Sequence, residues 1–165
     1  MRTSVLLYAG IIGAIFSLAA GYFFADLPLM TAPILLIGVV WVAAEIRGWR
    51  WIGSISLFLL IIGSAVGIIV EVDPIWAIMG TVLALAGWEL SYFRRFLKKA
   101  PWVRNEDQLV RRHHTRVIAV ALIGGVTAWL TTQIEVDIGF GVALLLAILS
   151  LLGLSRAVIF LRRTD

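Results

Sequence analysis

The sequence contains no cysteine and only two histidines among its 165 residues. Without cysteine the chain has no disulfide framework, no thiol redox chemistry and no thiolate metal site. Charge is scarce too: Asp, Glu, Lys and Arg make up 15% of the residues, whereas a soluble domain carries about 25%. The G-x-S-x-G elbow and the H-E-x-x-H zinc motif are also missing. We therefore expect no catalytic residues and no cofactor.

Apolar residues are abundant, at 61% of the chain, and the mean hydropathy is +1.01. They form six stretches of 18 to 24 residues, and a membrane-spanning helix needs about 20. Strands of a membrane barrel would alternate apolar and polar residues, but residues 57–62 are apolar without a break. The sequence therefore predicts an all-α, polytopic integral membrane bundle of six transmembrane helices. The predicted spans are 5–24, 28–46, 52–70, 74–93, 117–134 and 138–161.

These spans leave 45 residues for all loops and termini, too few for a soluble catalytic domain. We expect a single six-helix membrane domain over residues 1–165. Three connections of three residues each join the helices into hairpins over 5–46, 52–93 and 117–161, and residues 94–116 form the one sizeable loop. Because the first span is 20 residues long, beyond the roughly 7–15 of a signal-peptide core, we expect it to be a retained helix.

The three hairpins share features that indicate parallel repeats of one unit. The turn Glu71-Val72-Asp73 recurs identically at residues 135–137, and glycines recur in phase in the second helix of each hairpin. Two-span units preserve orientation, so repeats would be related by an axis along the membrane normal. The alternative is chance, because Leu, Ile and Gly match easily in any membrane protein.

Basic residues predict the orientation of the spans. Of the 14 Lys and Arg residues, 13 lie in the termini, residues 47–51 and the 94–116 loop, and the three short connections hold five acids and no base. Under the positive-inside rule, both termini and the long loop face the cytoplasm. We therefore expect a multi-pass protein of the plasma (inner) membrane.

The basic 94–116 loop is expected to contact anionic lipid headgroups on the cytoplasmic side of the bilayer. Nucleic acid is not expected as a partner, because no domain presents these groups to it. The sequence Asn105-Glu106-Asp107-Gln108 predicts a helix start well before the fifth span. The candidate headgroup contacts are Arg94, Arg95, Lys98, Lys99, Arg111 and Arg112.

Small residues predict where the helices approach one another. Lipid gives helices no hydrophobic reason to associate, so close backbone packing and hydrogen bonds must hold them together. Gly13, Ser17 and Gly21 follow one another at four-residue intervals in the first span, and Gly63 and Gly67 do so in the third. We expect them to pack within the chain. The alternative is that they face lipid and form a homo-oligomer or bind a membrane-protein partner.

Three charged residues lie inside the spans, all near predicted cytoplasmic ends: Glu45, Glu89 and Arg156. A charge at mid-membrane costs about 2.5–3.5 kcal/mol on insertion scales, so such residues are candidate functional groups. Glu89 and Arg156 have similar predicted depths and are a candidate ion pair, with Glu45 as a second candidate partner. The simpler interpretation is that Arg156 reaches the lipid headgroups and that the two glutamates reach the nearby belt of basic residues.

The remaining polar residues carry little chemistry. Ser64, Thr81 and Thr127 lie nearest to mid-span, where they would either hydrogen-bond within their helices or line a narrow polar path. His113 and His114 point about 100° apart on a helix and cannot chelate one ion as an i, i+4 pair would, so no metal site is expected. The sequence therefore favours a non-catalytic accessory, assembly or scaffold protein. A small-solute or ion transporter or channel is the alternative.

Overall fold

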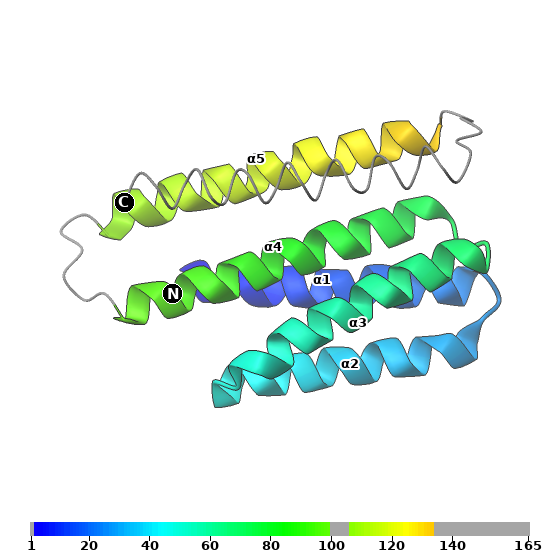
Figure 1. Ribbon diagram of the computed structural model, residues 1–165, viewed down its shortest axis with the longest axis horizontal. Helices are drawn as coiled ribbons and strands as arrows, with labels where there is room; N and C mark the ends of the chain where they lie inside the picture. The colour runs from blue at the N-terminus through cyan, green and yellow to red at the C-terminus, as the bar shows by residue number, and fades with distance from the viewer. Residues whose placement is uncertain (1, 100–105, 134–165) are drawn as a thin grey trace, which may run out of the picture. The chain divides into compact units, whose positions relative to one another are not determined.

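The computed structural model describes residues 2–99 and 106–133, and within them every regular element is an α-helix (Figure 1). Each of the five helices is long and apolar enough to cross a membrane, as expected of a multi-pass membrane protein. The helices are α1 Arg2–Phe24, α2 Pro28–Arg47, α3 Arg50–Ile69, α4 Pro74–Lys99 and α5 Glu106–Thr132.

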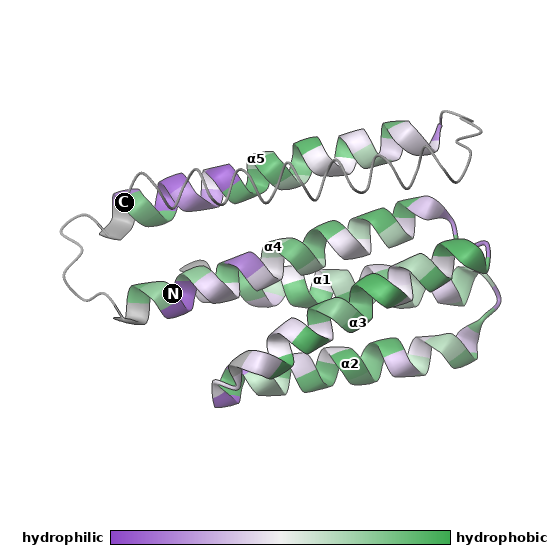
Figure 2. Cartoon of the chain, viewed as in Figure 1, coloured by the Kyte–Doolittle hydropathy of each residue, from purple (hydrophilic) through white to green (hydrophobic). Residues whose placement is uncertain are grey.

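Five of the six predicted spans lie within or closely match these helices. The sixth, 138–161, lies outside the described residues, so only the first helix of the third predicted hairpin is described. Two helices extend well beyond their predicted spans. Helix α4 continues to Lys99, and α5 begins at Glu106, where the sequence predicted a helix start. The first turns of α5 are hydrophilic and its remainder is apolar (Figure 2), so a span predicted from hydropathy covers only the apolar part.

The turns that follow α1 and α3 have the same backbone geometry. After α1, the Leu27 amide donates to the Tyr22 carbonyl and the Asp26 amide donates to the Phe23 carbonyl. After α3, the Val72 and Glu71 amides donate to residues 67 and 68 in the same pattern. This pair of bonds defines the Schellman C-cap, whose central residue is left-handed. Asp26 and Glu71 take that conformation, with φ of 58° and 64°.

The acids that the sequence places in these turns therefore have two different roles. Asp73 caps α4, because its Oδ1 atom accepts a hydrogen bond of 3.0 Å from the Ile75 amide. Asp26 does not cap α2, where the N-cap residue is Leu27 and no side-chain cap forms. The left-handed backbone at Asp26 gives the turn its direction instead.

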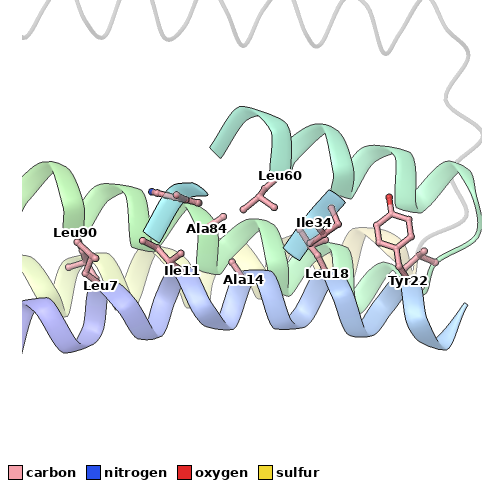
Figure 3. Close-up of a cluster of buried hydrophobic side chains, with 11 residues drawn as sticks. Leu7, Ile11, Ala14, Leu18, Tyr22, Ile34, Leu60, Ala84 and Leu90 are labelled. Carbon is pink, nitrogen blue, oxygen red and sulfur yellow. The ribbon is translucent and has the colours of Figure 1, made fainter. Parts of the chain in front are cut away.

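The core of the described part of the chain lies between α1 and its neighbours. Helix α1 packs most extensively on α4 and also contacts α2 and α3. Buried side chains follow one face of α1, from Leu7 through Ile11 and Ala14 to Leu18 and Tyr22, and meet residues of α2, α3 and α4 (Figure 3). This spacing of three and four residues is the one that keeps side chains on one helix face.

Helix α5 packs chiefly on α4, and none of its described side chains is buried. The two helices are antiparallel neighbours, since Phe93 stacks on His113 and Val82 lies beside Gly125. Hairpin partners α1–α2 and α3–α4 are in contact, but the most extensive packing joins α1 of the first hairpin to α4 of the second.

Candidate functional site

The small residues singled out in α1 face α4. A Cβ atom on Gly13 would lie 3.2 Å from Leu83 Cδ1, and one on Gly21 would lie 2.7 Å from Trp76 Cβ. Ser17 is buried, and its hydroxyl donates a 3.0 Å hydrogen bond to the Trp76 carbonyl. These residues set the distance between two helices and leave no space for a ligand at their positions.

The small residues of α3 also pack inside the chain. A Cβ atom on Gly63 would lie 2.9 Å from Ile34 Cδ1 of α2, and one on Gly67 would lie 3.4 Å from the Tyr22 hydroxyl of α1. That hydroxyl donates a 2.6 Å hydrogen bond to the Gly63 carbonyl. The absence of a side chain at Gly63 therefore leaves room for Ile34, and the Gly63 carbonyl accepts the hydrogen bond from Tyr22.

The closest backbone approach involves a residue that sequence reasoning missed. A Cβ atom on Gly10 would lie 3.2 Å from Gly87 Cα of α4. A strict four-residue stripe turns by about 40° at each step, because each residue advances about 100° around the helix. The face that meets α4 therefore includes Gly10 and Ala14 in addition to the predicted residues.

Two of the three mid-span hydroxyls form a hydrogen-bonded pair, in which Ser64 is buried and Thr81 is half-buried. Thr81 donates a 2.9 Å hydrogen bond to the Ser64 hydroxyl, which donates a 3.0 Å bond to the Leu60 carbonyl of its own helix. Thr127 is exposed on α5. The Ser64–Thr81 bond links α3 to α4, so these two hydroxyls hold helices together, and Thr127 lies apart from them.

A polar cluster joins α2 and α4 near the ends that carry Arg47 and Arg95. Glu45 Oε1 lies 3.3 Å from Arg95 Nη2, and their side chains are 6% and 23% exposed. The hydroxyl of fully buried Ser91 donates to the same carboxylate and accepts a bond from Arg95. The Arg95 Nε atom also donates to the Ser91 carbonyl at 3.2 Å. Each charge of this pair therefore has hydrogen-bonding partners, which a buried ion pair needs.

Trp41 borders this cluster and is completely buried. Its indole Nε1 atom has no hydrogen-bond partner among the described residues. A Cβ atom on Gly53 of α3 would lie 3.4 Å from Trp41 Nε1 and 3.5 Å from Glu45 Oε1. Gly53 thus allows the indole and the carboxylate to approach α3 from the same side.

Glu89, the second intramembrane carboxylate, lies on the other side of α4 from this cluster. Its Oε1 atom is 3.8 Å from His113 Nε2 of α5, and the two side chains are 43% and 20% exposed. His113 also stacks on Phe93, with ring centroids 3.8 Å apart and planes within 11°. The predicted partner of Glu89, Arg156, lies outside the described residues, so the Glu89–Arg156 pair stays a prediction.

The candidate headgroup contacts occupy the hydrophilic ends of α4 and α5. Arg111 and Arg112 are exposed on the first turns of α5, Arg94 is half-buried, and Arg95 turns inward to Glu45. Lys98 and Lys99 belong to the last turn of α4. Of the four arginines, Arg95 is the one engaged in an ion pair within the described part of the chain.

Two grooves of about 570 Å³ each border the contact between α4 and α5. The first also reaches α1, and His114 is the one titratable residue in its otherwise apolar lining. The second has an apolar body that includes Leu85, Val120 and Gly124, and one polar end. The polar end is formed by Glu89, His113 and Arg116. The second groove is therefore amphipathic along its length.

Within residues 2–99 and 106–133 no three His, Asp or Glu side chains gather as metal ligands would. The geometry thus offers helix contacts, one buried ion pair and one amphipathic groove. No family model, curated protein or solved structure matches the chain.

Proposed function

We propose that the chain is a non-catalytic membrane protein with an accessory, assembly or scaffold role. The observation that carries this proposal is the use of its buried and half-buried hydroxyl groups. Ser17, Tyr22, Ser64 and Thr81 all direct their hydroxyls to groups inside the bundle, and three of these four bonds join different helices. Polar residues of this kind hold transmembrane helices together.

The same hydroxyls argue against the transporter or channel alternative. A polar path through the bundle would need hydroxyls or charges that face a cavity. Ser64 and Thr81 bond to each other, and neither borders the two grooves beside α5. A liposome flux assay is the direct test: solute or ion uptake by the purified protein that Thr81→Val abolishes would favour transport over this proposal.

A scaffold or assembly protein needs a partner, either another membrane protein or a second copy of the chain. Capture of the tagged chain from native membranes in a mild detergent tests this directly. A stoichiometric partner, or a defined homo-oligomer by size-exclusion chromatography with light scattering, supports the proposal. A chain that is recovered alone and strictly monomeric contradicts it.

We further propose six spans, with both termini and the 94–116 loop on the cytoplasmic side of the plasma membrane. The charge distribution supports this orientation, and the matching turns after α1 and α3 support related hairpins. Because the chain lacks cysteine, single cysteines label unambiguously. Cysteines at Ser4 and Asn105 should react only after the inner face is opened, and one at Glu71 should react in intact cells. The opposite labelling pattern would show that the termini and the loop lie on the outer side of the membrane.

A further inference from the structure

We propose that the second groove, defined by Leu85, Glu89, His113, Arg116, Val120 and Gly124, binds one phospholipid with an ethanolamine headgroup. Its volume of about 570 Å³ lies within the range of about 300–1,000 Å³ typical of ligand sites. The site goes beyond the role proposed above, which needs no bound ligand. It also differs from diffuse attraction of lipids to the basic loop.

The polar end of the groove carries both signs of charge at one level of the helices. Glu89 and the arginine at position 116 both border it, with His113 between them in the lining. In the antiparallel pairing, Phe93 meets His113 and Val82 meets Gly125. Positions 89 and 116 are therefore close to opposite one another. A headgroup that matches this end needs a cation and an anion.

Glu89 provides the cation site. Its carboxylate is 43% exposed, it lies 3.8 Å from His113 Nε2, and it has no hydrogen bond within the described part of the chain. A carboxylate at a membrane-embedded position needs a partner of opposite charge, and a bound ammonium would take the place that the sequence predicts for Arg156. A primary ammonium supplies three donors, whereas the quaternary ammonium of choline supplies none.

Arg116 provides the anion site. It is exposed, and a guanidinium is well suited to bind phosphate oxygens in pairs. A headgroup without an amine, such as glycerol phosphate, would satisfy Arg116 but would place a net negative charge beside Glu89. Charge complementarity therefore favours the zwitterionic ethanolamine lipid over both choline and purely anionic lipids.

The apolar body of the groove continues from this polar end along α4 and α5. It runs from Glu89 to Val82 on α4 and from Arg116 to Gly124 on α5. Seven residues of helix correspond to about 10 Å, which accommodates part of an acyl chain lying parallel to the helices. The groove is open beside Gly124, because a Cβ atom built on this residue would have no other atom within 4 Å.

Native mass spectrometry of the purified full chain tests the proposal, with equimolar phosphatidylethanolamine, phosphatidylcholine and phosphatidylglycerol as probes. We expect one retained phosphatidylethanolamine per chain. Glu89→Gln should reduce the preference for ethanolamine over choline by roughly tenfold, as expected for loss of a charge-assisted hydrogen bond. Equal retention of the three lipids, preference for phosphatidylglycerol, or no retained lipid would overturn the proposal.

Two neighbouring glycines provide a matched pair of variants. Gly124→Leu fills the second groove, whereas Gly125→Leu projects toward the first groove, whose lining includes Gly125. We expect loss of the bound lipid in the first variant and its retention in the second, with equal helix content by circular dichroism. Retention in both variants, or loss in both, would contradict the assignment. Loss of self-association instead of lipid in Gly124→Leu would mean that a second copy occupies the groove.

Discussion

Gly10 of α1 lies directly against Gly87 of α4, so close that a Cβ atom on either residue would make a tighter contact than ordinary van der Waals packing allows. A Cβ atom on Gly10 would come within 3.2 Å of Gly87 Cα, and one on Gly87 would come within 3.2 Å of the Ile11 amide nitrogen. These two atoms belong to the backbone, which cannot move aside as the end of a flexible side chain can, and a Cβ atom on Gly87 would also lie 3.1 Å from Ile11 Cγ1. This contact therefore sets the spacing of the two helices that pack most extensively.

Replacing Gly10 with leucine should force α1 away from α4. We expect a loss of about 1–3 kcal/mol in the free energy of unfolding, the usual range for overpacking a well-packed site. Unfolding in mixed micelles of mild detergent and dodecyl sulfate, followed by circular dichroism, measures this loss. Gly124→Leu is the control, because a Cβ atom there meets nothing within 4 Å and leucine favours a helix more than glycine does. Equal stability of the two variants would contradict the packing role of Gly10.

The position of each helix could be predicted from the sequence, because an apolar run of about 20 residues has few alternatives to a membrane-spanning helix. The first four predicted spans begin within three residues of their helices. The start of α5 at Glu106 was also predictable, since it depends on a local capping pattern. Such features depend on neighbouring residues alone and need no knowledge of tertiary contacts.

The helix contacts were much harder to predict, because they depend on which faces meet. Gly13, Ser17 and Gly21 could be recognised as packing residues, but their partner helix could not. Short turns indicate that neighbouring helices pair, yet the most extensive contact joins α1 to α4, which are distant in sequence. Hydrophobicity gives no guidance in lipid, where most faces of a span are apolar.

The partners of the intramembrane charged residues were equally hard to predict from the sequence. Depth along the membrane can be estimated from sequence by counting residues, but the direction of a side chain around its helix axis cannot. Glu45 pairs with Arg95, which the sequence placed among the headgroup contacts, and Glu89 lies beside His113, which the sequence left without a partner. Ser91 links Glu45 to Arg95, but no sequence pattern distinguishes it from the other serines of the spans.

Replacing Glu45 with glutamine should destabilise the protein by about 1.5–3 kcal/mol, the range for a hydrogen bond to a charged group. The loss should be smaller than the 3–5 kcal/mol typical of a fully buried pair, because Arg95 remains 23% exposed. The same unfolding measurement applies. Glu89→Gln is the control, and it should change stability by less than about 1 kcal/mol, since Glu89 is 43% exposed and makes no described hydrogen bond.

A double-mutant cycle separates the interaction energy of the Glu45–Arg95 pair from the stability losses caused by the two single substitutions. Once Glu45 is glutamine, Arg95→Gln removes a charge that has already lost its partner. The double variant should therefore be more stable than the sum of the single losses predicts, by at least about 0.5 kcal/mol. Additive losses would show that Glu45 and Arg95 are not energetically coupled.

Tyr22→Phe should remove the hydroxyl that joins α1 to the Gly63 carbonyl of α3. The 2.6 Å bond lies between two helices, and such bonds in membrane proteins contribute about 0.6 kcal/mol on average, up to about 1.7. We expect a loss in this range by the same unfolding assay. Tyr92→Phe is the control, because Tyr92 is exposed and stacks on Trp88 through its ring, which the change keeps. An equal effect of both changes would contradict a specific role for the Tyr22 bond.

Glu71→Gly should stabilise the protein, although it removes a side chain. Glu71 has a φ of 64° in the Schellman turn after α3, a conformation that costs a residue with a side chain roughly 1–2 kcal/mol. Glycine avoids this cost but gains freedom in the unfolded chain, which offsets about 0.4–1 kcal/mol. The net gain should therefore lie between zero and about 1.6 kcal/mol. Glu71→Gln keeps the strain and removes only the charge, so it should leave stability unchanged.

Asp26→Gly should stabilise the protein less than Glu71→Gly does, because aspartate tolerates the left-handed region better than glutamate does. Equal or greater stabilisation by Glu71→Gln would show that charge, and not backbone strain, limits the stability of this turn.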